Sequence, residues 1–187
     1  MYSSYDVIGQ ELDVLEGNEK GFLRWLSKKL VFKSFTFSFE VPAAVFLRSK
    51  VFCDDIESVC EYVFNPEYLI DVLYDDFMEN IKVYGNDIPR MYQMIKSRDQ
   101  RLKLVSGQKE KVLNPERCVS IHCEISRKDA LRLEFMLSEI DTIYSVHYMI
   151  EDVLSIIFCD FVYELQQGNL KQITRDLLKR FLENEGE

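Results

Sequence analysis

The sequence predicts an α+β fold that is predominantly helical, with a small β-sheet and a long C-terminal helix. Glycine and proline, with 7 and 4 positions among 187, are too rare for a turn-rich all-β sandwich. Two segments alternate strictly between apolar and polar residues, which is typical of half-buried strands. Elsewhere the apolar residues recur every three or four positions, which indicates amphipathic helices.

The first 30 residues predict two helical segments, with a break at Gly17 and Asn18. Apolar residues at helical spacing flank this break, namely Leu12, Leu15, Phe22, Leu23, Trp25 and Leu26. The period then changes to two in residues 34–41, where three phenylalanines and a valine share one face of a strand. Pro42 is expected to end this strand.

A second strand is predicted over residues 119–125, where apolar and polar side chains again alternate. A shorter strand is expected over residues 101–105, and residues 106–115 are expected to form an exposed polar loop. Residues 45–52 fit either a helix or a strand. These assignments give the sheet at least two strands far apart in the chain.

Helices are predicted between the strands. Asp54 or Asp55 is expected to cap a helix that has Ile56, Val59, Cys60 and Val63 on one side. Asn65 and Pro66 then form a helix start, with asparagine as the N-cap and proline in the first turn. The core residues expected from this helix are Leu69, Val72, Leu73, Phe77 and Ile81. A short helix is expected over residues 88–96.

The C-terminal third has the most regular pattern. Ser126 and Asp129 form a capping-box pattern, and an apolar heptad seam follows. The seam runs through Leu133, Met136, Ile140, Ile143, His147, Ile150, Leu154, Ile157 and Phe161. One helix over residues 126–167 would be roughly 60 Å long, more than the width of about 40 Å of a domain this size. We therefore expect a central bundle helix that bends near residues 138–142, or a helix that protrudes to form a homodimer. Asn169 is expected to cap a final amphipathic helix.

The chain is expected to form a single domain over residues 1–187, with a mixed helix and strand portion (1–125) and a helical hairpin packed on it (126–187). No secretory signal or membrane-spanning run is visible, and the five scattered cysteines indicate a reducing cytoplasm. A strand at 118–125 would place Cys118 and His122 on the face opposite Cys123, which disfavours zinc. We expect no metal and no cofactor.

The charge is unevenly distributed along the chain. The formal net charge is −9, from 32 acidic and 23 basic side chains. Residues 54–81 alone contain nine acidic and no basic side chains, whereas residues 82–128 contain eleven basic and five acidic ones. This acidic stretch is the main indication of function in the sequence.

The spacing of these acids places them in rows. Glu67, Asp71, Asp75 and Glu79 are each four residues apart, so they share one helical face with a rise of about 6 Å per step. Asp54, Glu57 and Glu61 form a second row on the preceding helix. Like charges at this spacing destabilise a helix by a few tenths of a kcal/mol per pair. The rows therefore require an explanation other than helix stability.

Two explanations remain open. The acids can be neutralised within the chain by Arg90, Lys96, Arg98, Arg101 and Lys103. Alternatively, they form a docking surface for a basic partner protein. Regularly spaced carboxylates resemble a nucleic-acid backbone in sign and repeat, and phosphate contacts dominate the grooves that bind such backbones.

From these features we expect a non-enzymatic interaction protein that binds, and thereby inhibits, a basic partner such as a nucleic-acid enzyme or a toxin. Immunity proteins and phage anti-defence inhibitors, some acting as nucleic-acid mimics, are the natural settings for this activity. Direct binding of nucleic acid or of a membrane is not expected. A dimeric assembly or regulatory subunit, paired through the seam of residues 126–167, is an alternative.

An enzyme is the other alternative, either an unrecognised small hydrolase or a ribonuclease. Arg117 and His122 have the Arg-x4-His spacing that is similar to the motif of HEPN ribonucleases, in which a helical arginine and histidine cleave RNA. Because this segment alternates as a strand, a structural role is favoured. His147, the strongly polar residue of the heptad seam, is expected to be a core histidine, or to set register or act as a pH switch with Glu151.

Overall fold

The structure, a computed structural model, describes residues 1–16, 33–60, 63–84, 87–101, 103–106, 109–112 and 117–168. Three predictions lie outside these ranges: the break at Gly17 and Asn18 with the helical segment after it, the acidic residue Glu61, and the final helix after Asn169.

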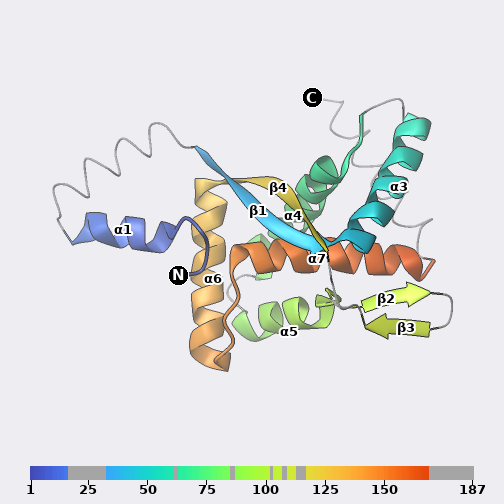
Figure 1. The fold of residues 1–187 in the computed structure, drawn as a ribbon. Helices are drawn as coiled ribbons and strands as arrows, with labels where there is room; N and C mark the ends of the chain where they lie inside the picture. Colours follow the sequence, from blue (N-terminus) through green and yellow to red (C-terminus); the bar gives the residue numbers. More distant parts are fainter. Residues whose placement is uncertain are drawn as a thin grey trace.

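The described elements confirm an α+β architecture that is mainly helical (Figure 1). In chain order they are α1 (Val7–Leu15), β1 (Ser34–Pro42), α3 (Ala43–Cys60), α4 (Pro66–Tyr84), α5 (Ile88–Arg98), β2 (Lys103–Ser106), β3 (Lys109–Val112), β4 (Cys118–Ser126), α6 (Arg127–Tyr144) and α7 (Ile150–Gln166). Strands β1 and β4 form one antiparallel pair, and β2 and β3 form another.

The β1–β4 pair forms as the alternation of both sequences predicts. Phe37 lies opposite Cys123 and Phe39 opposite Ile121, and all four side chains are buried on the same face. Helix α7 packs against this face, where the ring of Phe158 lies 6.1 Å from that of Phe39 in an edge-on arrangement. The opposite face carries hydroxyl and charged side chains, so the sheet is buried on one side only.

Two of the predicted helix starts are confirmed, at Asn65 and at Ser126. The Asn65 side chain accepts a hydrogen bond of 2.8 Å from the backbone N–H of Tyr68, and α4 begins at Pro66. At α6, Ser126 Oγ accepts a hydrogen bond from the N–H of Asp129 at 3.1 Å. These caps satisfy backbone N–H groups that have no partner within the helix.

The region between β1 and α4 differs from the prediction. Helix α3 begins at Ala43, directly after β1, so residues 45–52 are helical and Asp54 and Asp55 lie in the middle of a helix instead of capping one. The buried face of α3 runs through Val45, Ser49, Phe52, Cys53 and Ile56, which is one continuous helical stripe. Val59 and Val63, predicted to share one helix side with Ile56, are 71% and 78% exposed, whereas Ile56 is buried.

The predicted polar loop at residues 106–115 also differs, because β3 (Lys109–Val112) pairs with β2 as the second strand of a hairpin. In Figure 1 this hairpin lies beside the C-terminal part of α7, away from the β1–β4 sheet. A Lys-Glu-Lys-Val segment has no strong strand signal of its own, and cross-strand pairing sets its conformation.

The single long C-terminal helix is wrong: the seam is divided between α6 and α7, which run in clearly different directions (Figure 1). Ser145 adopts a left-handed conformation (φ 54°), and its N–H bonds to the Asp141 carbonyl at 2.8 Å. The Asp152 carboxylate accepts the Met149 N–H at 2.9 Å, and the Tyr2 carbonyl accepts the Ile150 N–H at the same distance. Polar groups thus cap a new helix start that heptad spacing does not reveal.

The seam is consequently covered by the chain itself. Its buried members are Leu133, Met136, Ile140, Ile150, Leu154, Ile157 and Phe161. They belong to the core that also contains the apolar residues of β1, α4 and α5. Ile143 is exposed at the end of α6, and His147 lies in the connection. The buried seam residues are therefore not available on the surface of this fold for pairing with a second copy.

A buried glutamate attaches the N-terminus to the core. Glu134, fully buried on α6, accepts hydrogen bonds from the N–H groups of Val7 and Ile8 at 3.0 and 2.7 Å, and one from the Ser3 hydroxyl. These N–H groups open α1, where a negative charge is favoured by the helix dipole. This carboxylate therefore fixes the position of α1 beside α6.

Candidate protein-binding surface

One acid of α3, Glu57, lies in the last turn of the helix, where the helix dipole disfavours a carboxylate. Asp54, Asp55 and Glu57 are exposed in the C-terminal half of α3, and no basic residue occupies its last turn. The C-terminal end of a helix dipole is negative, so carboxylates near it destabilise the helix. Asp55, first assigned as a possible cap, is thus a further member of this exposed acidic group.

The acids of α4 are divided between the surface and the core. Glu67 and Glu79 are exposed at the two ends of the row, and Asp75 is exposed between them. No basic side chain in the described ranges lies within salt-bridge distance of Glu67 or Glu79. We call the exposed carboxylates of Asp54, Asp55, Glu57, Glu67, Asp75 and Glu79 the acidic surface.

Asp71 is the exception in this row. It turns toward β4, where the Cys123 side chain and the Glu124 backbone hydrogen-bond to its carboxylate. Burial raises the pKa of Asp71; the two hydrogen bonds oppose this rise, and the charge of Asp75 adds to it. Asp71 therefore joins α4 to the sheet and does not belong to the acidic surface.

The bases expected to neutralise these acids have other partners. Arg98 pairs with Asp160 of α7 at 3.8 Å. Arg101 pairs with Asp99 at 2.9 Å and with Asp152 at 2.8 Å.

Two further bases of the same segment lie against aromatic rings. The Arg90 guanidinium is 3.5 Å from the centre of the Tyr84 ring, and the Lys96 ammonium is 5.5 Å from that of Tyr92. The Lys103 side chain lies outside the part that the structure describes. None of the four described bases forms an ion pair with Glu67 or Glu79, so neutralisation of these two acids by them is not observed.

Exposed apolar side chains accompany the acids. Val59 follows Glu57 by two residues, Val63 lies between α3 and α4, and Tyr68, 41% exposed, follows Glu67. Helices α3 and α4 pack against each other, so these side chains belong to one helical pair. Apolar spacing grouped Val59 and Val63 with Ile56, but the buried stripe of α3 runs through Val45, Phe52 and Ile56 and leaves both valines exposed.

His147 and Glu151 do not pair with each other. His147 is half exposed, and its Nδ1 lies 3.0 Å from the Asp141 carboxylate, which also accepts a hydrogen bond from the Tyr2 hydroxyl at 3.2 Å. The hydrogen bond with His147 is the main reason why the pKa of Asp141 is lowered. Glu151 instead accepts the Ser4 N–H at 2.9 Å. Both residues thus hold the N-terminal segment, and the expectation of a core histidine is wrong.

Arg117 and His122 do not form the helical pair that a HEPN ribonuclease requires. Residues 118–126 are strand β4, as the alternation predicted, and His122 is exposed opposite Ser38 of β1. Arg117 precedes the strand, where its carbonyl accepts the Ala43 N–H at 3.0 Å. Strand geometry at these residues therefore contradicts the predicted HEPN-like site.

The described residues contain no group of three or more His, Cys, Asp or Glu side chains arranged to hold a metal ion. Among the described helices, none combines the length and the apolar character needed to cross a membrane. No protein-family model, no curated protein and no solved structure matches this chain.

Proposed function

We propose that this protein binds a basic partner protein through the acidic surface of α3 and α4, and that binding blocks the partner's cationic site. In this proposal the protein is a non-enzymatic inhibitor that acts in the cytoplasm. A nucleic-acid enzyme or a toxin is the expected partner, because their active surfaces are commonly basic.

The exposed state of Glu67 and Glu79 is the observation that supports this proposal most. Both carboxylates lack an ionic partner among the described residues, while Arg98 and Arg101 pair with acids of α7 and with Asp99. A row of like charges left in this way attracts a cationic surface from a distance and accelerates association. The unfavourable position of the acid in the last turn of α3 supports the same interpretation.

The proposal does not require the carboxylates of the acidic surface to reproduce the regular phosphate spacing of a nucleic acid. Mimicry of a phosphate backbone would need carboxylates at regular intervals of about 6 Å along α4. Since Asp71 turns toward β4, the exposed positions 67, 75 and 79 are unevenly spaced. A basic protein surface requires no fixed repeat and fits this arrangement better.

Val59, Val63 and Tyr68 supply the apolar part of the proposed interface. Binding energy in protein interfaces is concentrated in a few buried side chains, with tyrosine among the most frequent. Charged side chains around them contribute association rate and specificity. We therefore expect Tyr68 to be the main anchor and the carboxylates to direct the partner to it.

Affinity capture with charge-reversal variants tests this proposal. The immobilised full-length protein is used to capture partners from native lysate, and the affinity of a captured protein is then measured across a salt series. The double variant Glu67→Lys/Glu79→Lys is expected to bind the partner at least 100-fold more weakly than the wild type. The affinity of the wild type is expected to fall steeply as the salt concentration rises. Asp71 is a poor choice for reversal because it contacts β4.

The matched control is the double variant Asp13→Lys/Glu40→Lys, which has the same charge change at exposed acids of α1 and β1. It is expected to retain the partner with less than a threefold loss. Equal losses in the two double variants would show that only net charge matters. A salt-independent affinity, or full retention by the α4 variant, would reject the acidic surface as the binding site.

A further inference from the structure

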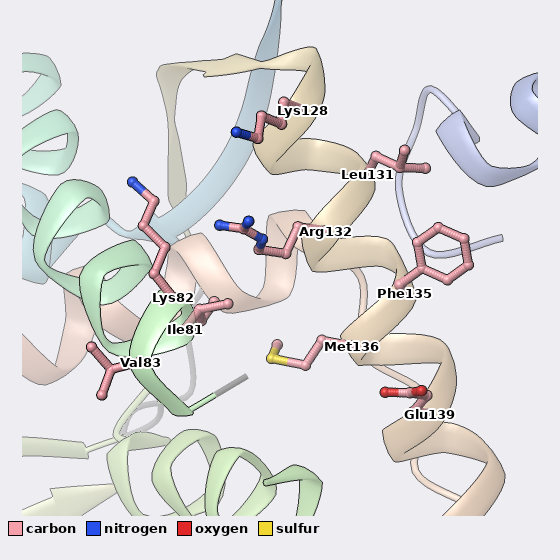
Figure 2. A pocket seen from close by; sticks show the side chains of 9 residues that line it. All are labelled: Ile81, Lys82, Val83, Lys128, Leu131, Arg132, Phe135, Met136 and Glu139. Carbon is pink, nitrogen blue, oxygen red and sulfur yellow. The ribbon is translucent and has the colours of Figure 1, made fainter. Parts of the chain in front are cut away.

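A pocket lies between the C-terminal part of α4 and the exposed side of α6. Its volume is about 610 Å³, large enough for a small organic ligand. Its lining residues are Ile81, Lys82, Val83, Lys128, Leu131, Arg132, Phe135, Met136 and Glu139. Figure 2 shows Lys82 and Ile81 of α4 and Arg132 and Met136 of α6 pointing into the space between the two helices.

Three cationic side chains meet at one end of this pocket. Lys128 and Arg132 are one helical turn apart on α6, and Lys82 comes from the last turn of α4. In Figure 2 their nitrogen-bearing ends gather in the space between the helices. None of the ion pairs in the described part of the chain includes any of the three.

Arg132 is the most unusual of these groups. Its Nη1 atom is buried and has no hydrogen-bond partner in the structure. A guanidinium N–H that is removed from water and left without an acceptor is energetically unfavourable. The buried hydroxyl of Tyr74 also has no hydrogen-bond partner. Burial raises the pKa of Tyr74, and the positive charge of Arg132 opposes this rise. The Arg132 Nη1 atom therefore presents a hydrogen-bond donor without an acceptor, although the charges of Asp129 and Asp75 also act on the Tyr74 phenol.

The rest of the pocket is apolar apart from one acid. Leu131, Phe135 and Met136 line the α6 side next to Arg132, and Val83 lies on α4. Glu139 is seven residues from Arg132, or about 10 Å along the helix. An anion is thus favoured at the Lys128 end and repelled at the Glu139 end, which gives a bound ligand one orientation.

We propose that this pocket binds an organic phosphate, with the phosphate on Lys82, Lys128 and Arg132 and an apolar group against Leu131, Phe135 and Met136. A phosphate monoester carries nearly two negative charges and several acceptor oxygens, which suit three cations and an unpartnered guanidinium better than a single carboxylate does. Arginine binds phosphate through two parallel hydrogen bonds. This site is separate from the acidic surface, and the proposal does not depend on the partner-binding function.

Calorimetric titration with phenyl phosphate, inorganic phosphate and benzyl alcohol tests the site. Phenyl phosphate is expected to bind with a submillimolar dissociation constant at low salt, at least tenfold more tightly than inorganic phosphate. Benzyl alcohol, which has the ring without the charge, is expected to show no binding. Phenyl phosphate should also shift the methyl NMR signals of Leu131 and Met136. No binding of phenyl phosphate, or equal binding of the two phosphates, would overturn the proposal.

Three variants locate the site within the protein. Arg132→Gln and Lys128→Met are each expected to weaken phenyl phosphate binding about tenfold. The control Lys50→Met removes the same charge from an exposed position on α3 and is expected to change affinity less than twofold. Because Lys128 is exposed, its variant is informative even if Arg132→Gln does not fold. An equal loss in Lys50→Met and Lys128→Met would assign the effect to net charge and reject the pocket.

Discussion

Two acidic regions of the molecule have similar charge densities and different surroundings. Residues 54–79 contain nine acidic and no basic side chains, and residues 129–168 contain eight acidic and one basic. In the second region the acids hold the fold together: Glu134 binds the start of α1, Glu151 binds Ser4, and Asp152 binds Arg101. In the first region most carboxylates are exposed at the protein surface.

The difference teaches that a count of charges does not separate structural acids from surface acids. Several C-terminal acids lie beside backbone N–H groups or basic side chains that come from distant parts of the chain. Such contacts link segments more than 100 residues apart in the case of α1 and α6. Among the acids of α4, Asp71 makes such a contact, with β4, whereas no ion pair within the described residues includes Glu67 or Glu79.

Replacement of Glu134 has the largest expected effect. In Glu134→Ala the N–H groups of Val7 and Ile8 and the Ser3 hydroxyl lose their acceptor in the protein interior. Loss of a buried carboxylate with several donors typically lowers the free energy of unfolding by roughly 3–5 kcal/mol. Urea denaturation followed by circular dichroism measures this change.

The neighbouring exposed acid provides the control. Glu139→Ala, five residues further along α6, is expected to change the free energy of unfolding by less than about 0.5 kcal/mol. Glu134→Gln keeps one acceptor oxygen and is expected to lie between these two variants. Similar destabilisation by both alanine variants would show that Glu134 has no special structural role.

Local sequence patterns predicted the sheet and several helix starts correctly. Residues 34–41 and 119–125 each show the alternation in their own sequence, because each strand buries only one face. Asn65 and Ser126 cap helices through contacts three residues away, which a sequence displays directly.

Long-range contacts explain what the sequence did not predict. The seam over 133–161 keeps its spacing across the break at Ser145, since that break depends on Tyr2 and on the caps from Asp141 and Asp152. The buried face of α3 is likewise set by α4, α7 and β1. The acids of the candidate surface were identified from spacing, but the inward turn of Asp71 depends on β4.

Asp160 is the C-terminal acid that is least well satisfied, and its replacement should be stabilising. Burial raises the pKa of Asp160 to about 6, and Arg98 at 3.8 Å offsets this only in part. Because the unfolded pKa is about 3.9, the ionised form destabilises the folded state. Asp160→Asn is expected to raise the free energy of unfolding at pH 7.5 by about 1–2 kcal/mol. This gain is smaller than the full pKa shift of Asp160 implies, because the variant also loses the ion pair with Arg98.

The pH dependence of the stability gain in Asp160→Asn shows whether the titration of Asp160 causes it. A raised folded pKa means that the folded state binds the proton more tightly, so wild-type stability increases as pH falls from about 6 to about 4. The advantage of Asp160→Asn should therefore shrink over this range. Parallel unfolding curves at pH 4.5 and 7.5 measure the difference. An advantage that is independent of pH would indicate a cause other than the titration of Asp160.

The acids of α4 have the smallest expected effect, and its sign distinguishes the two regions. Glu79 lies one turn after Asp75 and near the C-terminal end of α4, so its carboxylate is disfavoured by both its neighbour and the helix dipole. Glu79→Lys should raise the free energy of unfolding by about 0.5 kcal/mol, through a favourable pair with Asp75. Glu67→Lys should change the free energy of unfolding little, because relief of repulsion from Asp71 is offset by loss of a favourable charge in the first turn.

Denaturation of both variants at low and high salt measures these changes, and the gain in Glu79→Lys should diminish with salt. A loss of more than about 1 kcal/mol in Glu79→Lys would mean that Glu79 stabilises the fold as Glu134 does, and the two regions would then no longer differ.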